Sequence, residues 1–260
     1  MNEKEALLVV SFGTSYPETC ERTIGAIEDH LAAAFPDRRL YRAWTSSIIR
    51  RKLKGAGVNI DSVAEAMERM AADGVTDVLV QSTHLLIGEE YDKLCREIAE
   101  GKGTFSTVAV GAPLLAEEKD IAVLAEILPE LCPPLGAEDM MVWMGHGSGA
   151  LRMPVYQILD DLLEKGGHPD FCVGTVEFDP GFDAVLERVR QRRPKRVVLA
   201  PLMVVAGDHA TNDMAGDEPD SWKSLLEAEG VEVECVLKGL GEYDAIRTLY
   251  AAHARNGRAL

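Results

Sequence analysis

The sequence predicts an α/β protein made of two similar halves, each a parallel sheet flanked by helices. Short apolar segments typical of buried strands alternate along the chain with longer segments in which apolar residues recur at helical spacing. The same order of segments occurs twice, and the turn-rich segment Cys132-Pro-Pro-Leu-Gly136 separates the two copies. The predicted domains are therefore residues 1–132 and residues 137–260.

The first half alternates buried strands with helices. Four strands are expected where apolar residues run together, at residues 6–10, 40–44, 77–80 and 107–110. A helix is expected from Pro17 until Phe35-Pro36 closes it, because apolar side chains recur every three or four positions up to Leu31. A second helix is expected to begin at Ser62 and Glu65, which match a capping box, and a third covers residues 117–131.

The second half repeats this order, which indicates an internal duplication. Its strands are expected at residues 141–144, 171–176, 196–200 and 231–237, and its helices from Pro154, from Gly181, at 222–229 and at 242–254. An offset of 132 residues aligns the halves at first, and the offset falls to 119 beyond an insertion between about residues 46 and 77. The aligned pairs are Thr14 with His146, Thr45 with Glu177, and Glu90 with His209. His146, Glu177 and His209 are potential metal ligands, and the first half has other residues at these three positions. Only the second half is therefore expected to bind metal.

Three potential metal ligands follow successive strands of the second half. His146 stands between two glycines after strand 141–144, Glu177 follows strand 171–176, and His209 follows the apolar path from strand 196–200. Their spacing of about one strand–helix–strand unit would place them along the carboxyl edge of one parallel sheet, where ligands bind in such folds. Two imidazoles and a carboxylate suit a first-row divalent metal ion and leave coordination positions open. The alternative interpretation of His146 is a loop histidine without a task.

Composition narrows the classes of protein and partner. The net charge of −16 argues against nucleic acid and anionic membranes as partners. The five cysteines are scattered without a C-x-x-C pair, which favours a reducing compartment, and no signal-peptide pattern follows Met1. We therefore expect a soluble, cytoplasmic protein, and a homo-oligomer stays open. Neither phosphate-binding glycine motif, G-x-x-x-x-G-K-[ST] or G-x-G-x-x-G, is present at the strand ends, so no nucleotide cofactor is expected.

A basic segment stands out from this acidic chain. It contains five cations within thirteen positions: Arg42, Arg50, Arg51, Lys52 and Lys54. One interpretation is the solvated face of a helix. The other is a cationic rim for a polyanionic substrate, for which arginine offers two parallel hydrogen bonds to a carboxylate.

Several segments resemble the anaerobic sirohydrochlorin cobaltochelatases, the CbiK-type members of the class II chelatases. They include Ser11-Phe-Gly-Thr-Ser-Tyr16, Arg42-Ala-Trp-Thr45, Ile49-Arg-Arg-Lys-Leu53, Met144-Gly-His-Gly147 and Ala206-Gly-Asp-His-Ala-Thr-Asn-Asp-Met214. The resemblance implies two Rossmann-like, chelatase-like domains that share a cleft. It also implies ATP-independent insertion of Co²⁺ into sirohydrochlorin on the route to cobalamin.

The resemblance further implies roles for individual residues. His146 and Glu177 are the implied catalytic residues, and together with His209 they are the implied metal ligands. The first half is expected to bind the substrate through Phe12, Gly13, Thr14, Arg50, Arg51, Ser82 and His84. Sirohydrochlorin carries eight carboxylates, which favours the substrate-binding interpretation of the basic segment.

Three other functions stay open from the sequence. The nearest is insertion of Fe²⁺ by the same fold to make sirohaem, because a His/His/Glu site accepts both metals. A non-catalytic tetrapyrrole or metal carrier is an alternative of another class. A nucleotide-binding Rossmann protein is the least favoured, because its glycine motif is absent.

Overall fold

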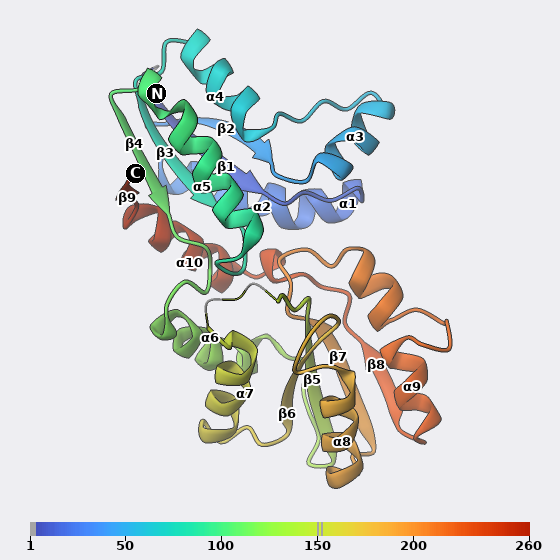
Figure 1. The fold of residues 1–260 in the computed structure, drawn as a ribbon. Coiled ribbons are helices and arrows are strands. Elements are labelled where there is room, and N and C mark those ends of the chain that lie inside the picture. Colours follow the sequence, from blue (N-terminus) through green and yellow to red (C-terminus); the bar gives the residue numbers. More distant parts are fainter. Residues whose placement is uncertain (1–3, 150, 152) are drawn as a thin grey trace. The chain divides into compact units, whose positions relative to one another are not determined.

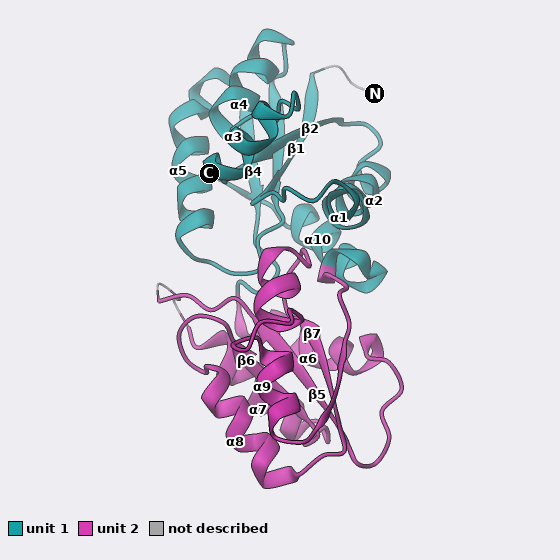
Figure 2. Cartoon of the chain, turned by 90° about the vertical axis from the view of Figure 1, so that its right-hand side faces the viewer, with its two compact units in different colours: residues 1–116, 241–260 teal, residues 117–240 magenta. Residues whose placement is uncertain are grey.

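The chain folds into two compact α/β units (Figure 2), and the computed structural model describes residues 4–149, 151 and 153–260. The first unit is Met1–Ala116 with Gly241–Leu260, and the second is Glu117–Leu240. None of the described helices is long and apolar enough to cross a membrane.

The unit boundaries differ from the expected domains at both ends. Helix α6 (Glu118–Leu131) belongs to the second unit, where it packs against α7 (Val155–Lys165). The C-terminal helix α10 (Asp244–Arg255) belongs to the first unit, because it packs against strands β3 and β4 and helix α2. The turn-rich linker marks only the end of α6. The burial of apolar helix faces decides which unit a helix joins.

The first unit is built on a five-stranded sheet in the order β2-β1-β3-β4-β9 (Figure 1). Its strands are β1 (Glu5–Ser11), β2 (Arg39–Trp44), β3 (Asp77–Ser82), β4 (Thr107–Gly111) and β9 (Arg258–Ala259). The first four are parallel, and β9 pairs antiparallel with β4. Apolar residues of β1 that alternate along the strand, such as Leu8 and Val10, share a core with α4 and α5.

The helices of the first unit agree with the expectations in part. The helix expected from Pro17 to Phe35-Pro36 consists of α1 (Pro17–Cys20), a π-helical segment (Glu21–Gly25) and α2 (Ala26–Ala34). Helix α4 (Val63–Ala72) begins with the expected capping box of Ser62 and Glu65. Helix α5 (Glu89–Gly101) and the helical form of the basic segment, α3 (Ser47–Gly55), are additions to the expected elements.

The second unit has a four-stranded parallel sheet in the order β6-β5-β7-β8 (Figure 1). The strands are β5 (Asp139–Gly145), β6 (Phe171–Thr175), β7 (Arg196–Pro201) and β8 (Glu232–Cys235). The remaining helices are α7, α8 (Phe182–Arg192), a π-helical segment (Ala210–Met214) and α9 (Trp222–Ala228). Met140, Val142 and Met144 of β5 share a core with residues of α8 and α9.

The two sheets have the same strand order, but two of the three aligned pairs are wrong. The backbone N–H of Ser46 donates to the carbonyl of Phe12 (3.2 Å), and the N–H of Glu177 donates to the carbonyl of His146 (2.8 Å). Phe12 and Ser46, rather than Thr14 and Thr45, are therefore the counterparts of His146 and Glu177. The offset of 132 residues that pairs Thr14 with His146 also sets Gly13 against Gly145. The glycines that share a left-handed backbone are Gly13 (φ 102°) and Gly147 (φ 86°).

The 119-residue offset that pairs Glu90 with His209 holds in the sheets. The N–H of Thr83 donates to the carbonyl of Val10, and the N–H of Leu202 donates to the carbonyl of Met144 in the same way. Phe12 and Ser46 carry no imidazole or carboxylate. The first unit therefore has weaker metal ligands at these positions than the second unit has in His146 and Glu177.

Candidate metal centre

His146 and His209 come together within the second unit. His146 directly follows β5, and His209 lies in the first helical turn after β7. Their ring centroids are 4.7 Å apart and the two planes are nearly perpendicular, at 86°. Both side chains reach the surface. The segments that follow β5 and β7 thus place a pair of accessible imidazoles side by side, as the spacing of the sequence predicts.

Each of these rings has one nitrogen held by an oxygen. His146 Nδ1 lies 2.8 Å from the carbonyl oxygen of Gly147, and His209 Nδ1 lies 2.7 Å from Oδ2 of Asp213. A carbonyl or carboxylate oxygen only accepts, so Nδ1 carries the proton in both neutral rings. The lone pairs of the two Nε2 atoms are left to bind a metal ion or a proton, an arrangement common among metal-ligating histidines.

Glu177 lies next to this pair through its backbone. Its N–H donates to the carbonyl of His146 (2.8 Å), and its side chain is exposed. Among the described residues, no group of three or more His, Cys, Asp or Glu side chains is arranged to hold a metal ion. The structure therefore brings the two histidines together, and the carboxylate of Glu177 does not complete a three-ligand cluster with them.

The backbone around His146 has no room for side chains at its glycines. A Cβ atom on Gly147 would lie 1.6 Å from the carbonyl oxygen of Glu177, and one on Gly145 would lie 2.3 Å from the ring of Tyr156. The buried Tyr156 hydroxyl also accepts a hydrogen bond from the N–H of Gly147 (3.3 Å). The glycines thus let β5, the loop after β6 and α7 approach closely, which fixes the position of His146.

Asp213 and Tyr156 are residues that the sequence reasoning missed. Asp213 follows His209 by four positions, a spacing at which helical side chains meet, so the sequence contained a signal for this contact. Tyr156 gave no such signal, because its position is typical of an ordinary buried helix residue.

Most of the expected substrate-binding residues near β1 and β3 have partners inside the first unit. His84 Nδ1 lies 2.8 Å from the Ser82 hydroxyl, and its Nε2 lies 3.3 Å from the Thr45 hydroxyl. Burial lowers the pKa of His84 to about 4, although Glu90 opposes this shift. Ser82 is fully buried.

The expected residues after β1 form a turn with a single exposed aromatic side chain. Gly13 has a left-handed backbone, and a Cβ atom there would lie 2.5 Å from the ring of Trp44. The Thr14 side chain is buried and accepts a hydrogen bond from the N–H of Tyr16 (3.3 Å). Phe12 is the exception, with 48% of its surface exposed.

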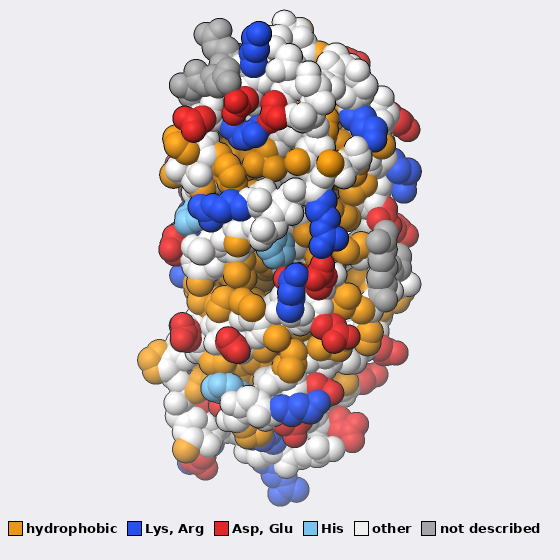
Figure 3. All heavy atoms as spheres, turned by 90° about the vertical axis from the view of Figure 1, so that its left-hand side faces the viewer, with side chains coloured by type: hydrophobic (Ala, Val, Ile, Leu, Met, Phe, Trp, Pro, Cys, Tyr) orange, Lys and Arg blue, Asp and Glu red, His pale blue; other side chains and the backbone are white. Residues whose placement is uncertain are grey.

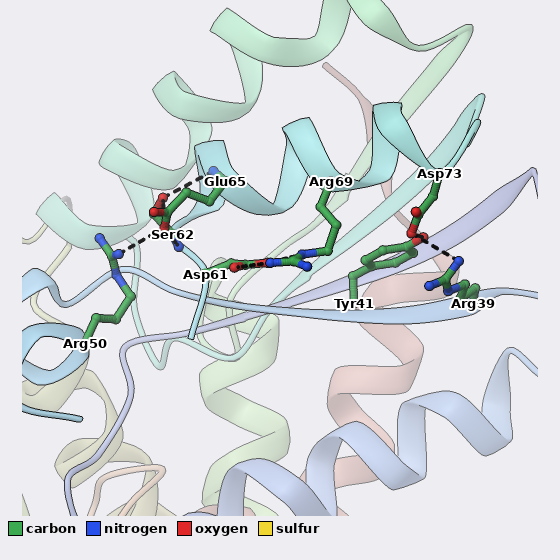
Figure 4. A network of polar contacts seen from close by, with 8 residues as sticks. All are labelled: Arg39, Tyr41, Arg50, Asp61, Ser62, Glu65, Arg69 and Asp73. Atoms are coloured by element: carbon green, nitrogen blue, oxygen red, sulfur yellow. Dashed lines mark hydrogen bonds and ion pairs between the residues drawn. The ribbon is translucent and has the colours of Figure 1, made fainter. Parts of the chain in front are cut away.

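The cations of the basic segment differ in whether a carboxylate of the first unit pairs with them. Arg42 is bonded to the buried carboxylate of Glu28. Arg50 reaches Glu65 of the α4 capping box (3.3 Å; Figure 4), and its side chain is only 22% exposed. Arg51, Lys52 and Lys54 are exposed on α3, and the Lys52 amine donates to the Ser15 hydroxyl (3.1 Å). Arg42 and Arg50 are thus paired with carboxylates of the first unit, whereas Arg51, Lys52 and Lys54 are exposed on α3.

Comparison with known proteins gives consistent matches over the whole chain. A family described as cobalt chelatase (CbiK) matches residues 5–258. A sirohydrochlorin cobaltochelatase from Salmonella typhimurium is 43% identical over 96% of this chain and 95% of its own length. The sirohydrochlorin cobaltochelatase CbiKC from Nitratidesulfovibrio vulgaris is 34% identical over 96% of this chain and 89% of its own length.

Solved structures support the fold. SirB from Bacillus subtilis, solved with Fe³⁺, aligns with a TM-score of 0.64 at 13% identity and covers 97% of this chain and 95% of its own. A multi-domain protein from Deinococcus radiodurans, described as structurally similar to chelatases, aligns with a TM-score of 0.61 at 14% identity. That alignment covers 99% of this chain and 57% of the other. At these identities the likeness concerns the fold alone.

Proposed function

Because the chain belongs to the cobalt chelatase (CbiK) family, we propose that it inserts Co²⁺ into sirohydrochlorin to form cobalt-sirohydrochlorin on the anaerobic route to cobalamin. The observation that carries this proposal is the pair of imidazoles at His146 and His209. Their Nδ1 atoms are held by oxygen acceptors, and their Nε2 atoms lie at the accessible carboxyl edge of one sheet.

The reaction exchanges one metal ion for two protons. Co²⁺ leaves its protein and water ligands, binds the four ring nitrogens of sirohydrochlorin, and two pyrrole N–H groups lose their protons. A neutral Nε2 can bind the metal ion or accept a proton, and one nitrogen does not do both at once. We infer that both rings hold the metal ion before the substrate binds, and that during insertion one ring releases the metal and takes a pyrrole proton while the other still holds it.

Glu177 is the proposed third ligand and carboxylate. Its support is its position, since its N–H is bonded to the His146 carbonyl and its side chain is free to turn in solvent. A carboxylate beside two neutral imidazoles would offset part of the charge of the metal ion.

The substrate contacts in the first unit stay predictions. The exposure of each side chain indicates how well it is suited to contact the substrate. Arg51 is the best suited to pair with a substrate carboxylate, because its guanidinium is exposed on α3 and carries five donors. Phe12 can offer an exposed apolar ring. Gly13, Thr14, Arg50, Ser82 and His84 are more suited to shape this surface, because their side chains are absent, buried or paired.

A metal-competition assay tests the function. Purified apoprotein is given sirohydrochlorin and either Co²⁺ or Fe²⁺ without nucleotide, and metallation is followed by absorbance. We expect turnover with Co²⁺ that exceeds turnover with Fe²⁺, and we expect His146→Ala to lose it by orders of magnitude while the melting temperature is unchanged. Faster turnover with Fe²⁺ would support the sirohaem alternative, and tight binding without turnover would support a carrier.

The other partner and location predictions also need direct tests. On the face drawn in Figure 3, described basic side chains are interspersed with acidic ones, a pattern unlike the basic stripe of a nucleic-acid-binding surface. Independence from nucleotides, a homo-oligomeric state and a cytoplasmic location stay predictions, to be tested by the assay above, by light scattering and by cell fractionation.

A further inference from the structure

Phe178 combines an exposed aromatic ring with a strained backbone. It is 58% exposed and has φ 65°, in the left-handed region. Among the described residues other than glycine, only Phe178 and Arg193 have a positive φ. A bulky side chain rarely adopts this conformation, which persists where the surrounding structure enforces it and is frequent at functional sites.

Neighbouring groups hold the Phe178 loop in this conformation. The Thr175 hydroxyl lies 2.8 Å from the carbonyl oxygen of Glu177 and 2.9 Å from that of Phe178, and the N–H of Thr175 donates to the Pro180 carbonyl (2.7 Å). Thr175 is fully buried at the end of β6. One buried side chain and the end of a strand therefore anchor the loop on both sides of Phe178.

The Phe178 ring lies against the loop that carries His146. A Cβ atom on Gly149 would lie 2.8 Å from Cε1 of Phe178, so the ring lies close to the Gly149 backbone. Phe178 also directly follows Glu177, whose N–H is bonded to the His146 carbonyl. The same loops that position the imidazole and the proposed carboxylate ligand thus present an apolar ring beside them, and most of that ring stays in water.

We propose that Phe178 packs against the tetrapyrrole and contributes to the affinity for the macrocycle. This inference rests on the proposed function, because that function supplies the ligand. A macrocycle whose nitrogens take the metal from His146 and His209 extends beyond the metal on all sides, so it meets neighbouring side chains. A flat conjugated ligand is a suitable partner for an exposed phenyl ring, in stacked or edge-to-face contact. The strain at Phe178 is retained because it holds the ring where the macrocycle binds.

The test compares variants that remove the phenyl ring of Phe178. Glycine at this position also relieves the backbone strain, whereas alanine keeps it. Phe178→Ala and Phe178→Gly are expected to weaken metal-free sirohydrochlorin binding about tenfold, measured by ligand absorbance, with Phe178→Leu in between. Their affinity for Co²⁺ alone, measured by calorimetry, should stay within twofold of the wild type. Phe178→Gly should melt at a higher temperature than Phe178→Ala, because glycine adopts the left-handed backbone freely.

Arg193 provides the matched control, because it has φ 51° at the end of α8, outside the residues proposed to bind metal or substrate. Arg193→Gly should also melt above Arg193→Ala, and neither should alter sirohydrochlorin binding. Unchanged binding in Phe178→Ala would overturn the inference, as would an equal loss of Co²⁺ affinity, which would indicate that the ring only supports the His146 loop. If the wild type binds sirohydrochlorin without metallating it, the proposed function fails and the Phe178 inference stands.

Discussion

We expect the contact between Asp213 and His209 to contribute to the affinity of the protein for Co²⁺. Asp213 Oδ2 lies 2.7 Å from Nδ1 of His209, which fixes the tautomer and the direction of the Nε2 lone pair. Removing such a partner typically lowers metal affinity by roughly 10–100-fold. The two side chains are 36% and 48% exposed, so water screens the carboxylate and favours the lower end of that range. We therefore expect Asp213→Ala to weaken Co²⁺ binding about tenfold, or ~1.4 kcal/mol.

The assay is calorimetric titration of the apoprotein with Co²⁺. Asp213→Asn should lose only about two- to threefold, because the amide oxygen still accepts the Nδ1 proton although its charge is gone. Asp217→Ala is the control, since Asp217 is an exposed carboxylate of the same segment that pairs with Lys223 (2.8 Å) instead of a histidine. An Asp213→Ala affinity for Co²⁺ within twofold of the wild type, or an equal loss in Asp217→Ala, would show that Asp213 does not orient His209 for the metal ion.

Three further predictions concern substrate, pH and backbone. Replacing Arg51 and Lys52 by glutamine should raise the KM for sirohydrochlorin more than it lowers kcat, and the effect should shrink with added salt. An unchanged KM at low salt would indicate that the basic segment is only the solvated face of a helix. His84 takes up a proton near pH 6.5 when unfolded but only near about 4 when folded, so the free energy of unfolding should fall by roughly 3 kcal/mol as the pH drops through that window. Urea denaturation should show this slope, and His84→Gln should lose it. Gly147→Ala should destabilise the protein by more than Gly230→Ala, for which ~1 kcal/mol is expected. Both glycines have a left-handed backbone, but only Gly147 lacks space for a Cβ atom. Equal losses in melting temperature would contradict this.

The strands and the histidine pair were predictable because local patterns determine them. Buried parallel strands read as apolar runs, and the segments that follow them share one edge of the sheet, so His146 and His209 could be placed together. The strand itself ends earlier than the apolar path indicated, because β7 stops at Pro201, eight residues before His209. Helix α5 was readable too, since Leu94 and Ile98 recur at helical spacing, but it was not among the expected elements.

Tertiary contacts decide the features that the sequence could not supply. The apolar face of α10 fits several partners, and only the folded chain shows that it packs on the sheet of the first unit. The left-handed turn at Gly147 sets the true register of the duplication, and a glycine in a sequence does not reveal the sign of its φ angle. The ion pair of Arg50 and the burial of Ser82 likewise depend on neighbours distant in sequence.

The position of bound Co²⁺ shows directly whether His146 and His209 form the metal centre. Crystals soaked with Co²⁺ and measured at the cobalt absorption edge give an anomalous peak at the metal. We predict one peak at about 2.1 Å from Nε2 of both His146 and His209, with the Glu177 carboxylate turned toward it. A peak beside His84 and Glu90, with none at the histidine pair, would show that the first unit holds the metal and would contradict the proposed centre.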